Sequence, residues 1–237
     1  VYAAARWAET GGASETAMGD VQRAWFLSTL EGSASTWKVW GNEFCLNSRI
    51  VDLTGAPTLP EAFRQRFKLS AEDWDGMPMR RDELISSLAE VGNVVAITGD
   101  IHAFFASSPG TSADPSVKIP EFVTGAASSS SYKTLLIRAT QNDPDLLAAG
   151  APAMALFAET FLLDPEVRPN PHLAHVDLEG HGYSVFEADA EHLTATFHAI
   201  HEKHAAGDLG APDTWDDLVT VTRFRVEDGS AELYKDV

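Results

Sequence analysis

The sequence predicts a mixed α/β fold in which helices pack on layered sheets, and three observations indicate it. Residues 93–98 form a nearly continuous apolar, β-branched run, as expected for a strand buried on both faces. Residues 20–30 and 79–90 carry apolar side chains at helical spacing. Residues 181–200 and 218–234 alternate apolar and polar residues around turn sequences, which predicts two antiparallel hairpins. This order is typical of α/β layers whose strand ends carry functional loops.

The remaining elements follow from turn residues and composition. The first predicted helix ends before Gly32, and the second ends at Gly92. Residues 1–16 are small, polar and glycine-containing, so we expect a loop. The other expected elements are a short strand that ends at Gly41, a short helix at 60–67, a buried strand at 119–126, a flexible serine loop at 128–131 and a helix at 144–163.

Composition excludes several classes of function. The chain has 237 residues, 44% of them hydrophobic, which is enough for one large or two small domains with a substantial core. The formal charge of −18 repels phosphate backbones, so no broad nucleic-acid-binding face is expected. No apolar run approaches the roughly 18 residues that span a bilayer, and the start shows no signal-peptide pattern. The single cysteine, Cys45, excludes an internal disulfide.

The strand at 93–98 ends in an unusual way. Gly99 interrupts the apolar run, and Asp100 and His102 follow it at once. Open α/β sheets place their sites at the carboxyl ends of strands. A hard carboxylate oxygen beside an imidazole nitrogen suits iron, zinc or manganese, singly or as a pair. A pair of metals can clamp a phosphoryl group and activate water, while a loop Asp and a surface His are the alternative.

Five segments resemble, in the same order, the family of PhoD-type alkaline phosphatases. "VVAITGDIHAFFAS" is similar to the family's Gly-Asp-x-His strand end, and "AMGDVQRAWFLSTLEGSASTWKVWGNE" to its helix, serine-rich turn and Trp-Lys-Val strand. The other three are "DWDGMPMRRDELISSL", "EFVTGAASSS" and "NPHLAHVDLEGHGYSVFEADAEHLTATF". The resemblance covers most of residues 17–226.

The resemblance implies a calcineurin-like metallophosphoesterase fold, a four-layer αββα sandwich with mixed sheets. It implies hydrolysis of phosphate mono- or diesters, with Asp100 and His102 as the catalytic metal ligands. It also implies a multi-metal centre of iron and calcium, although zinc or manganese would suit the same donors. Family members are generally exported through the twin-arginine route, so the implied location is periplasmic or extracellular.

The chain also departs from the family. The motifs of the family's N-terminal half, among them a strand-end Cys or Asp ligand and an Asp-Asp-His-Glu segment, are not found in the sequence. We therefore expect residues 1–237 to be the C-terminal half of such a domain, with 17–237 as the sandwich portion. A companion N-terminal segment would supply the other ligands. The rival hypotheses are a non-catalytic scaffold or binding subunit, and a metal-dependent hydrolase of another ester such as a lactone.

Other polar residues have weaker claims to a functional role. Asn42 ends a strand and is a candidate substrate-binding residue, although an Asn that caps the backbone is the alternative. Glu43 follows it where the family usually shows Gln. We expect Asp75 to be a turn or N-terminal helix residue rather than a ligand. Arg80 and Arg81 are expected on the surface, with contact to a phosphate as the alternative. We expect surface or hydrogen-bonded positions for His172 and His181, with the pocket mouth as the alternative. His198, His201 and His204 are expected to be solvated, with adventitious metal binding as the alternative, and Cys45 to lie in the core.

Overall fold

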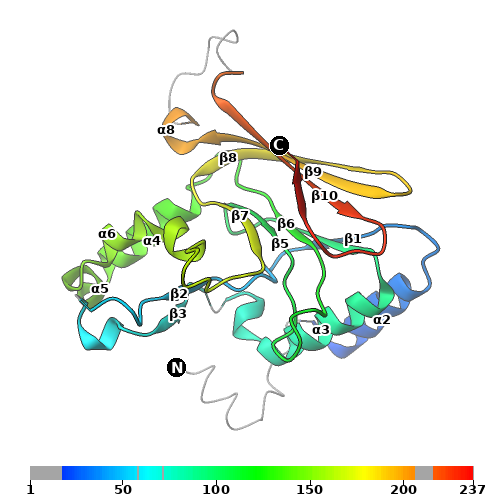
Figure 1. Cartoon of the computed structure of the whole chain (residues 1–237), viewed down its shortest axis with the longest axis horizontal. Helices are drawn as coiled ribbons and strands as arrows, with labels where there is room; N and C mark the ends of the chain where they lie inside the picture. Colours follow the sequence, from blue (N-terminus) through cyan, green and yellow to red (C-terminus); the bar gives the residue numbers. More distant parts are fainter. Residues whose placement is uncertain (1–17, 58, 71, 206–215, 237) are drawn as a thin grey trace.

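The structure, a computed structural model, describes residues 18–57, 59–70, 72–205 and 216–236. The loop expected at 1–16 lies outside these residues. Within them the chain forms three layers: helices, a central sheet and a second sheet (Figure 1). The mixed α/β fold is therefore confirmed. The described residues hold three of the four layers of the expected αββα sandwich, and no helical layer among them covers the outer face of the second sheet.

The central sheet has five strands in the order β1-β4-β6-β5-β7. In chain order β1, β4, β5, β6 and β7 span Lys38–Asn42, Val94–Thr98, Phe104–Ser107, Glu121–Val123 and Leu173–Asp177. Strands β1, β4 and β6 run parallel, whereas β5 is antiparallel to both of its neighbours. The sheet is therefore mixed, and β5 is a strand that the sequence did not reveal because it follows β4 after only five residues.

The second sheet is antiparallel, in the order β11-β10-β9-β8. Strands β8 and β9 pair along their full length and confirm the hairpin expected at 181–200. Strands β10 and β11 confirm the later hairpin, and Gly229 adopts a φ of 71° in its turn. The four strands span Gly180–Ala188, His192–His201, Val219–Glu227 and Tyr234–Asp236.

Helices cover the other face of the central sheet in two groups (Figure 1). Helices α2 and α3 form one group, and the short helices α4 to α7 form the other beside the β2–β3 hairpin. The α-helices α2 to α8 span Asp20–Glu31, Pro78–Val91, Tyr132–Asn142, Pro144–Ala148, Ala151–Ala155, Ala158–Leu162 and Glu202–Ala205. The hairpin strands β2 and β3 span Ile50–Asp52 and Arg66–Lys68, and two 3-10 turns, η1 and η2, span Glu61–Phe63 and Trp74–Gly76.

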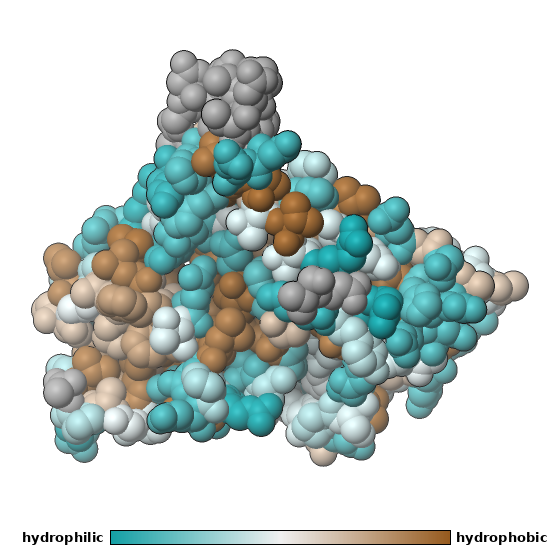
Figure 2. All heavy atoms as spheres, turned by 45° about the horizontal axis from the view of Figure 1, so that its top comes forward, coloured by the Kyte–Doolittle hydropathy of each residue, from teal (hydrophilic) through white to brown (hydrophobic). Residues whose placement is uncertain are grey.

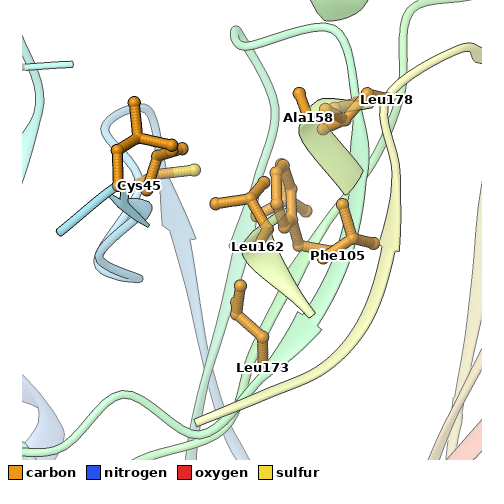
Figure 3. Packing of buried hydrophobic residues seen from close by; sticks show 11 residues of the cluster. Cys45, Phe105, Ala158, Leu162, Leu173 and Leu178 are labelled. Atoms are coloured by element: carbon orange, nitrogen blue, oxygen red, sulfur yellow. The ribbon is translucent and has the colours of Figure 1, made fainter. Parts of the chain in front are cut away.

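Three hydrophobic clusters hold these layers together. Between the sheets, Phe122 lies 6.2 Å from Phe197 and 6.3 Å from Phe224, measured between ring centroids. The other two clusters lie under the helices. In one of them Leu162 of α7 lies beside Phe105 of β5 (Figure 3). Burial on both faces explains why the sequences of β4, β5 and β6 are so apolar.

Some expectations about helices were wrong. The helix expected at 60–67 is a single 3-10 turn followed by strand β3. The helix expected at 144–163 is three short helices, because Gly150 adopts a left-handed φ of 78° and Pro152 follows it. The serine loop passes into α4, whose N-cap is Ser131. Within the described residues, no helix combines the length and the apolar character that a membrane crossing requires.

A buried carboxylate on β6 fixes the loop that follows β1. Glu121 is fully buried and accepts hydrogen bonds from the backbone N–H groups of Leu46 (2.8 Å) and Asn47 (2.9 Å). It also accepts bonds from Asn47 Nδ2 (2.8 Å) and Thr98 Oγ1 (2.9 Å). Burial raises the pKa of the Glu121 carboxyl, and the hydrogen bonds oppose this shift. Glu121 thereby joins the loop at 43–47 to the ends of β4 and β6.

We expect Glu121→Ala to lower the free energy of unfolding of the complete protein by about 3 kcal/mol, because four buried donors lose their acceptor. Glu121→Gln keeps the shape and one acceptor oxygen, so its loss should be clearly smaller. Urea unfolding measures both values. A loss below about 1 kcal/mol for Glu121→Ala would contradict the structural role of this carboxylate.

Candidate metal centre

The candidate site lies at the carboxyl edge of the parallel strands. Asn42 and Thr98 end β1 and β4 and are direct partners in the sheet, and Thr98 in turn pairs with Val123 at the end of β6. Residues Gly99 to Ala103 then connect β4 to β5 across this edge. Asp100 and His102 both belong to that connection, as the sequence pattern predicts for a site in an α/β sheet.

The backbone is left-handed at both candidate ligands. The φ angles are 63° at Asp100 and 57° at His102, and Asn93 and Arg168 are the other described residues that have a side chain and a positive φ. Ile101 N donates to Gly99 O at 2.7 Å, which closes a three-residue turn centred on Asp100. Such a conformation costs a residue with a side chain roughly 1–2 kcal/mol, and strain of this kind concentrates at functional sites. Gly99 itself has no positive φ.

The imidazole of His102 is held from one side. His102 Nδ1 lies 2.8 Å from the carbonyl oxygen of Ser130, and the N–H of Tyr132 donates to the His102 carbonyl at 2.9 Å. A carbonyl oxygen can only accept, so Nδ1 carries the proton and donates it. The other ring nitrogen, Nε2, is then a lone-pair donor. Metal-binding histidines are commonly fixed in this way, by a hydrogen bond from the ring nitrogen that does not bind the metal.

The sequence did not reveal that Ser130 and Tyr132 hold His102. Both act through backbone groups, which every residue possesses, so no side-chain pattern distinguishes them. The serine-rich loop was expected to be flexible. The Ser130 carbonyl oxygen of this loop contacts the His102 imidazole, and the N–H of Tyr132, directly after the loop, donates to the His102 carbonyl oxygen.

The Asp100 carboxylate is exposed and forms no hydrogen bond or ion pair with another described residue. The pair therefore offers a free anionic oxygen and an oriented imidazole nitrogen, donors that fit iron, zinc or manganese. No group of three or more His, Cys, Asp or Glu side chains suited to a metal is found in the part of the chain that the structure describes. A catalytic metal usually needs at least three protein ligands, so this donor set is incomplete.

Asn42 lies at the same edge but its amide is engaged. It donates to the carbonyl oxygen of Phe44, and its Nδ2 lies 3.4 Å from Thr98 Oγ1. The side chain is nearly buried. These contacts match an Asn that caps the backbone after a strand. Its place next to Thr98 is compatible with a substrate-binding role only if the amide exchanges partners. Glu43, which follows it, is exposed.

Two polar residues, Asp75 in the turn η2 and Arg81 in the first turns of α3, are buried and structural. Asp75 is a turn residue as expected, and its carboxylate accepts bonds from the Ser48 hydroxyl and from Lys68 Nζ at 3.2 Å. Arg81 was expected on the surface, which is wrong: it is 6% exposed and donates to the carbonyl oxygens of Leu46 (2.6 Å) and Gly110 (3.0 Å). Arg80 is partly exposed and pairs with Glu83.

His172 and His181, on either side of β7, are hydrogen-bonded, and neither belongs to a group of three or more potential metal ligands among the described residues. His172 Nε2 lies 2.9 Å from the Ser48 carbonyl oxygen, and burial lowers the pKa of this imidazole to about 4. His172 lines a surface cavity of about 510 Å³ together with Arg81 and Lys118. His181 is buried and contacts two carbonyl oxygens. Cys45 is fully buried, as expected.

The three histidines at 198, 201 and 204 do not converge on a metal site. His198 stacks on Tyr183 at 4.8 Å between ring centroids, on the outer face of the second sheet. His201 is an exposed partner of Glu179, with 3.3 Å between Nε2 and the carboxylate. His204 lies in the single turn α8. These three histidines therefore give no support to a metal site on this part of the chain.

The left-handed backbone at Asp100 generates a stability prediction. We expect Asp100→Gly to be more stable than Asp100→Ala by about 1 kcal/mol, because glycine adopts positive φ without a steric cost. The matched control is Asp82 in helix α3, where Gly should be about 1 kcal/mol less stable than Ala. Urea unfolding of the four variants measures both differences. If the Gly variant were less stable than the Ala variant at Asp100 as well as at Asp82, the Asp100 backbone would not be strained.

The comparisons with known proteins agree with this architecture. The sequence model of the family described as PhoD-like phosphatase matches residues 3–197. Alkaline phosphatase D of Bacillus subtilis (strain 168) is 26% identical over 102 residues, which are 42% of this chain and 16% of that protein. A solved structure of PhoD superposes with a TM-score of 0.55 at 16% identity. It matches 92% of this chain, whereas this chain covers 35% of it. The chain therefore belongs to the PhoD-like phosphatase family.

Proposed function

We propose that this chain supplies part of the metal centre of an enzyme that hydrolyses phosphate mono- or diesters. The observation that carries the proposal is the turn after β4, which holds Asp100 and His102 in strained backbone and leaves His102 Nε2 free of described partners. Two polar residues separated by one position both adopt positive φ, and backbone strain of this kind concentrates at functional sites. Membership of the PhoD-like phosphatase family supports phosphate esters as the substrate class.

The residues of this chain would act by binding and orientation. Asp100 would contribute an anionic oxygen, and His102 would contribute Nε2 while Ser130 keeps the proton on Nδ1. The bound metal would supply Lewis acidity toward the phosphoryl oxygens and lower the pKa of a coordinated water. Iron and calcium are the metals that the family resemblance favours, and zinc or manganese also suits an Asp–His pair. We also infer from the family an exported protein that acts in the periplasm or outside the cell.

The test uses the complete enzyme with Asp100→Ala and His102→Ala. Because a metal ligand is removed, kcat/KM of each variant on a phosphodiester should fall at least about 100-fold. Elemental analysis of each variant should show less than one equivalent of metal. The fold should persist, as judged by circular dichroism. The control is the triple variant His198→Gln, His201→Gln and His204→Gln, which should stay within a few-fold of the wild type. Full activity of both single variants would refute the site.

One rival hypothesis also has an observation in its favour. The described residues provide only two ligands, so the chain could belong to a binding or scaffold subunit that retains the fold without a working metal centre. Such a subunit would carry no stoichiometric metal in the complete protein.

The other rival hypothesis is a metal-dependent hydrolase of another ester. A substrate panel that includes lactones would separate a phosphoesterase from such an enzyme.

We further propose that a segment from the N-terminal part of the enzyme completes the centre and pairs with β1. The edge of β1 that faces away from β4 is unpaired within the described residues, and Val39 is 51% exposed. Lys38 N donates to Asn93 O on the β4 side, so the N–H of Val39 points to the open edge. An unpaired edge of this kind readily accepts another strand.

Val39→Pro tests this pairing because it removes the outward N–H and leaves the bonds between β1 and β4 intact. In the complete enzyme we expect it to cost about 3 kcal/mol of unfolding free energy and to lower the metal content. Val39→Thr, which keeps the N–H, should cost less than about 1 kcal/mol. Hydrogen exchange provides an independent check: rapid exchange of the Val39 and Gly41 amides in the wild type would show that no strand covers this edge.

A further inference from the structure

The serine loop that orients His102 is itself held by a second histidine. His181 Nε2 lies 2.8 Å from the carbonyl oxygen of Ser129, the residue that precedes Ser130. Two consecutive carbonyl groups of one loop therefore bind two imidazoles that come from different elements. His102 follows β4 in the central sheet, whereas His181 is the second residue of β8 in the other sheet.

The loop has little else to fix it. The side chains of Ser128 and Ser129 are exposed, so no hydrophobic burial holds this stretch. The other contacts reach the far end: Arg138 Nη1 donates to Ser130 Oγ at 3.1 Å, and Ser131 Oγ donates to Glu202 at 2.6 Å. Among the described residues, His181 is the partner that holds the Ser129 peptide group.

His181 is in turn rigidly placed. It is 7% exposed. Gly182 N donates to Ala126 O at 3.1 Å, which ties β8 to the start of the same loop. Gly182 has a φ of 156°, and a Cβ there would lie 1.9 Å from the His198 carbonyl oxygen, so the backbone of β8 packs directly on β9 at this point. The imidazole therefore presents its Nε2 to the loop from a fixed support.

We infer that His181 is a positioning residue for the metal ligand His102, acting through the Ser129–Ser130 backbone. By fixing this peptide segment, His181 keeps the Ser130 carbonyl oxygen in place to accept the Nδ1 proton of His102, which leaves Nε2 as the coordinating atom. The inference rests on the proposed function insofar as it concerns metal binding. The orientation of His102 can be measured without any metal.

The expected effect is modest but specific. Removal of a hydrogen-bond partner of a metal-binding histidine typically costs 10–100-fold in metal affinity. His181 acts one residue further away, so we expect about a tenfold loss. The hydrogen bond itself is the cause, so a side chain that keeps a donor at the position of Nε2 should restore the affinity.

The experiment compares His181→Met and His181→Gln in the complete protein. Methionine keeps the volume without a donor, whereas the Gln amide can still donate to Ser129 O. Nitrogen NMR of the imidazole reports the tautomer of His102 in the metal-free protein. We expect a single Nδ1–H tautomer in the wild type and His181→Gln, and a mixture of tautomers in His181→Met with about tenfold weaker binding of Mn²⁺ or Zn²⁺.

Two further variants keep the result interpretable. His181→Asn, whose side chain is too short to reach Ser129 O, should behave like His181→Met and replaces it if that variant folds poorly. His198→Met, on the adjacent strand β9, should leave both the tautomer and the affinity unchanged. A single Nδ1–H tautomer and wild-type affinity in folded His181→Met and His181→Asn would overturn the inference. Absence of metal binding in the wild type would instead overturn the proposed function, and the tautomer would still test the role of His181.

Discussion

The connection from β4 to β5 is the constraint on which the site depends. Strand β6 lies between β4 and β5 in the sheet, so the chain must cross its carboxyl end and reverse direction within residues 99–103. Neighbouring strands are about 4.8 Å apart, so the crossing covers about 10 Å. Both flanking strands are almost wholly buried and cannot shift to relieve it. The left-handed backbone at Asp100 and His102 is the local result of this short crossing.

The contacts around the connection offset its strain. On the β4 side of the connection, Glu121 joins Thr98 to the loop after β1, so the end of β4 is fixed before the crossing begins. Within the connection, the N–H of Tyr132 binds the His102 carbonyl oxygen and the Ser130 carbonyl oxygen binds the His102 side chain. Strained residues persist where surrounding structure determines them fully. The sheet therefore determines the position of Asp100 and His102, and the serine loop determines the orientation of the His102 imidazole.

The surfaces that the described chain leaves uncovered are compatible with a larger enzyme. The outer edge of β1 is open, and the outer face of the second sheet exposes Tyr183, Val185 and Val221. Hydrophobic residues also gather over α4 to α6, at the left of Figure 2. Leu147 in α5 and Leu156 and Phe157, which follow α6, are exposed. Proteins seldom leave several such areas exposed without a partner. The chain spans about a third of the solved PhoD chain that it resembles.

The sequence by itself determined the fold class, the buried strand at 93–98, both hairpins and the pair Asp100–His102 at a strand end. These features depend on local periodicity and on turn residues, which a single chain displays directly. The sequence also identified the family through five ordered motifs. It did not indicate β5, because a strand that follows after five residues has no separate boundary signal, and it placed Arg81 on the surface although backbone carbonyls enclose it. Only the tertiary structure decided which nitrogen of His102 is free and which residues hold it. Those contacts join imidazole side chains to backbone carbonyl groups far away in the chain, and backbone carbonyl groups are the same for every amino acid.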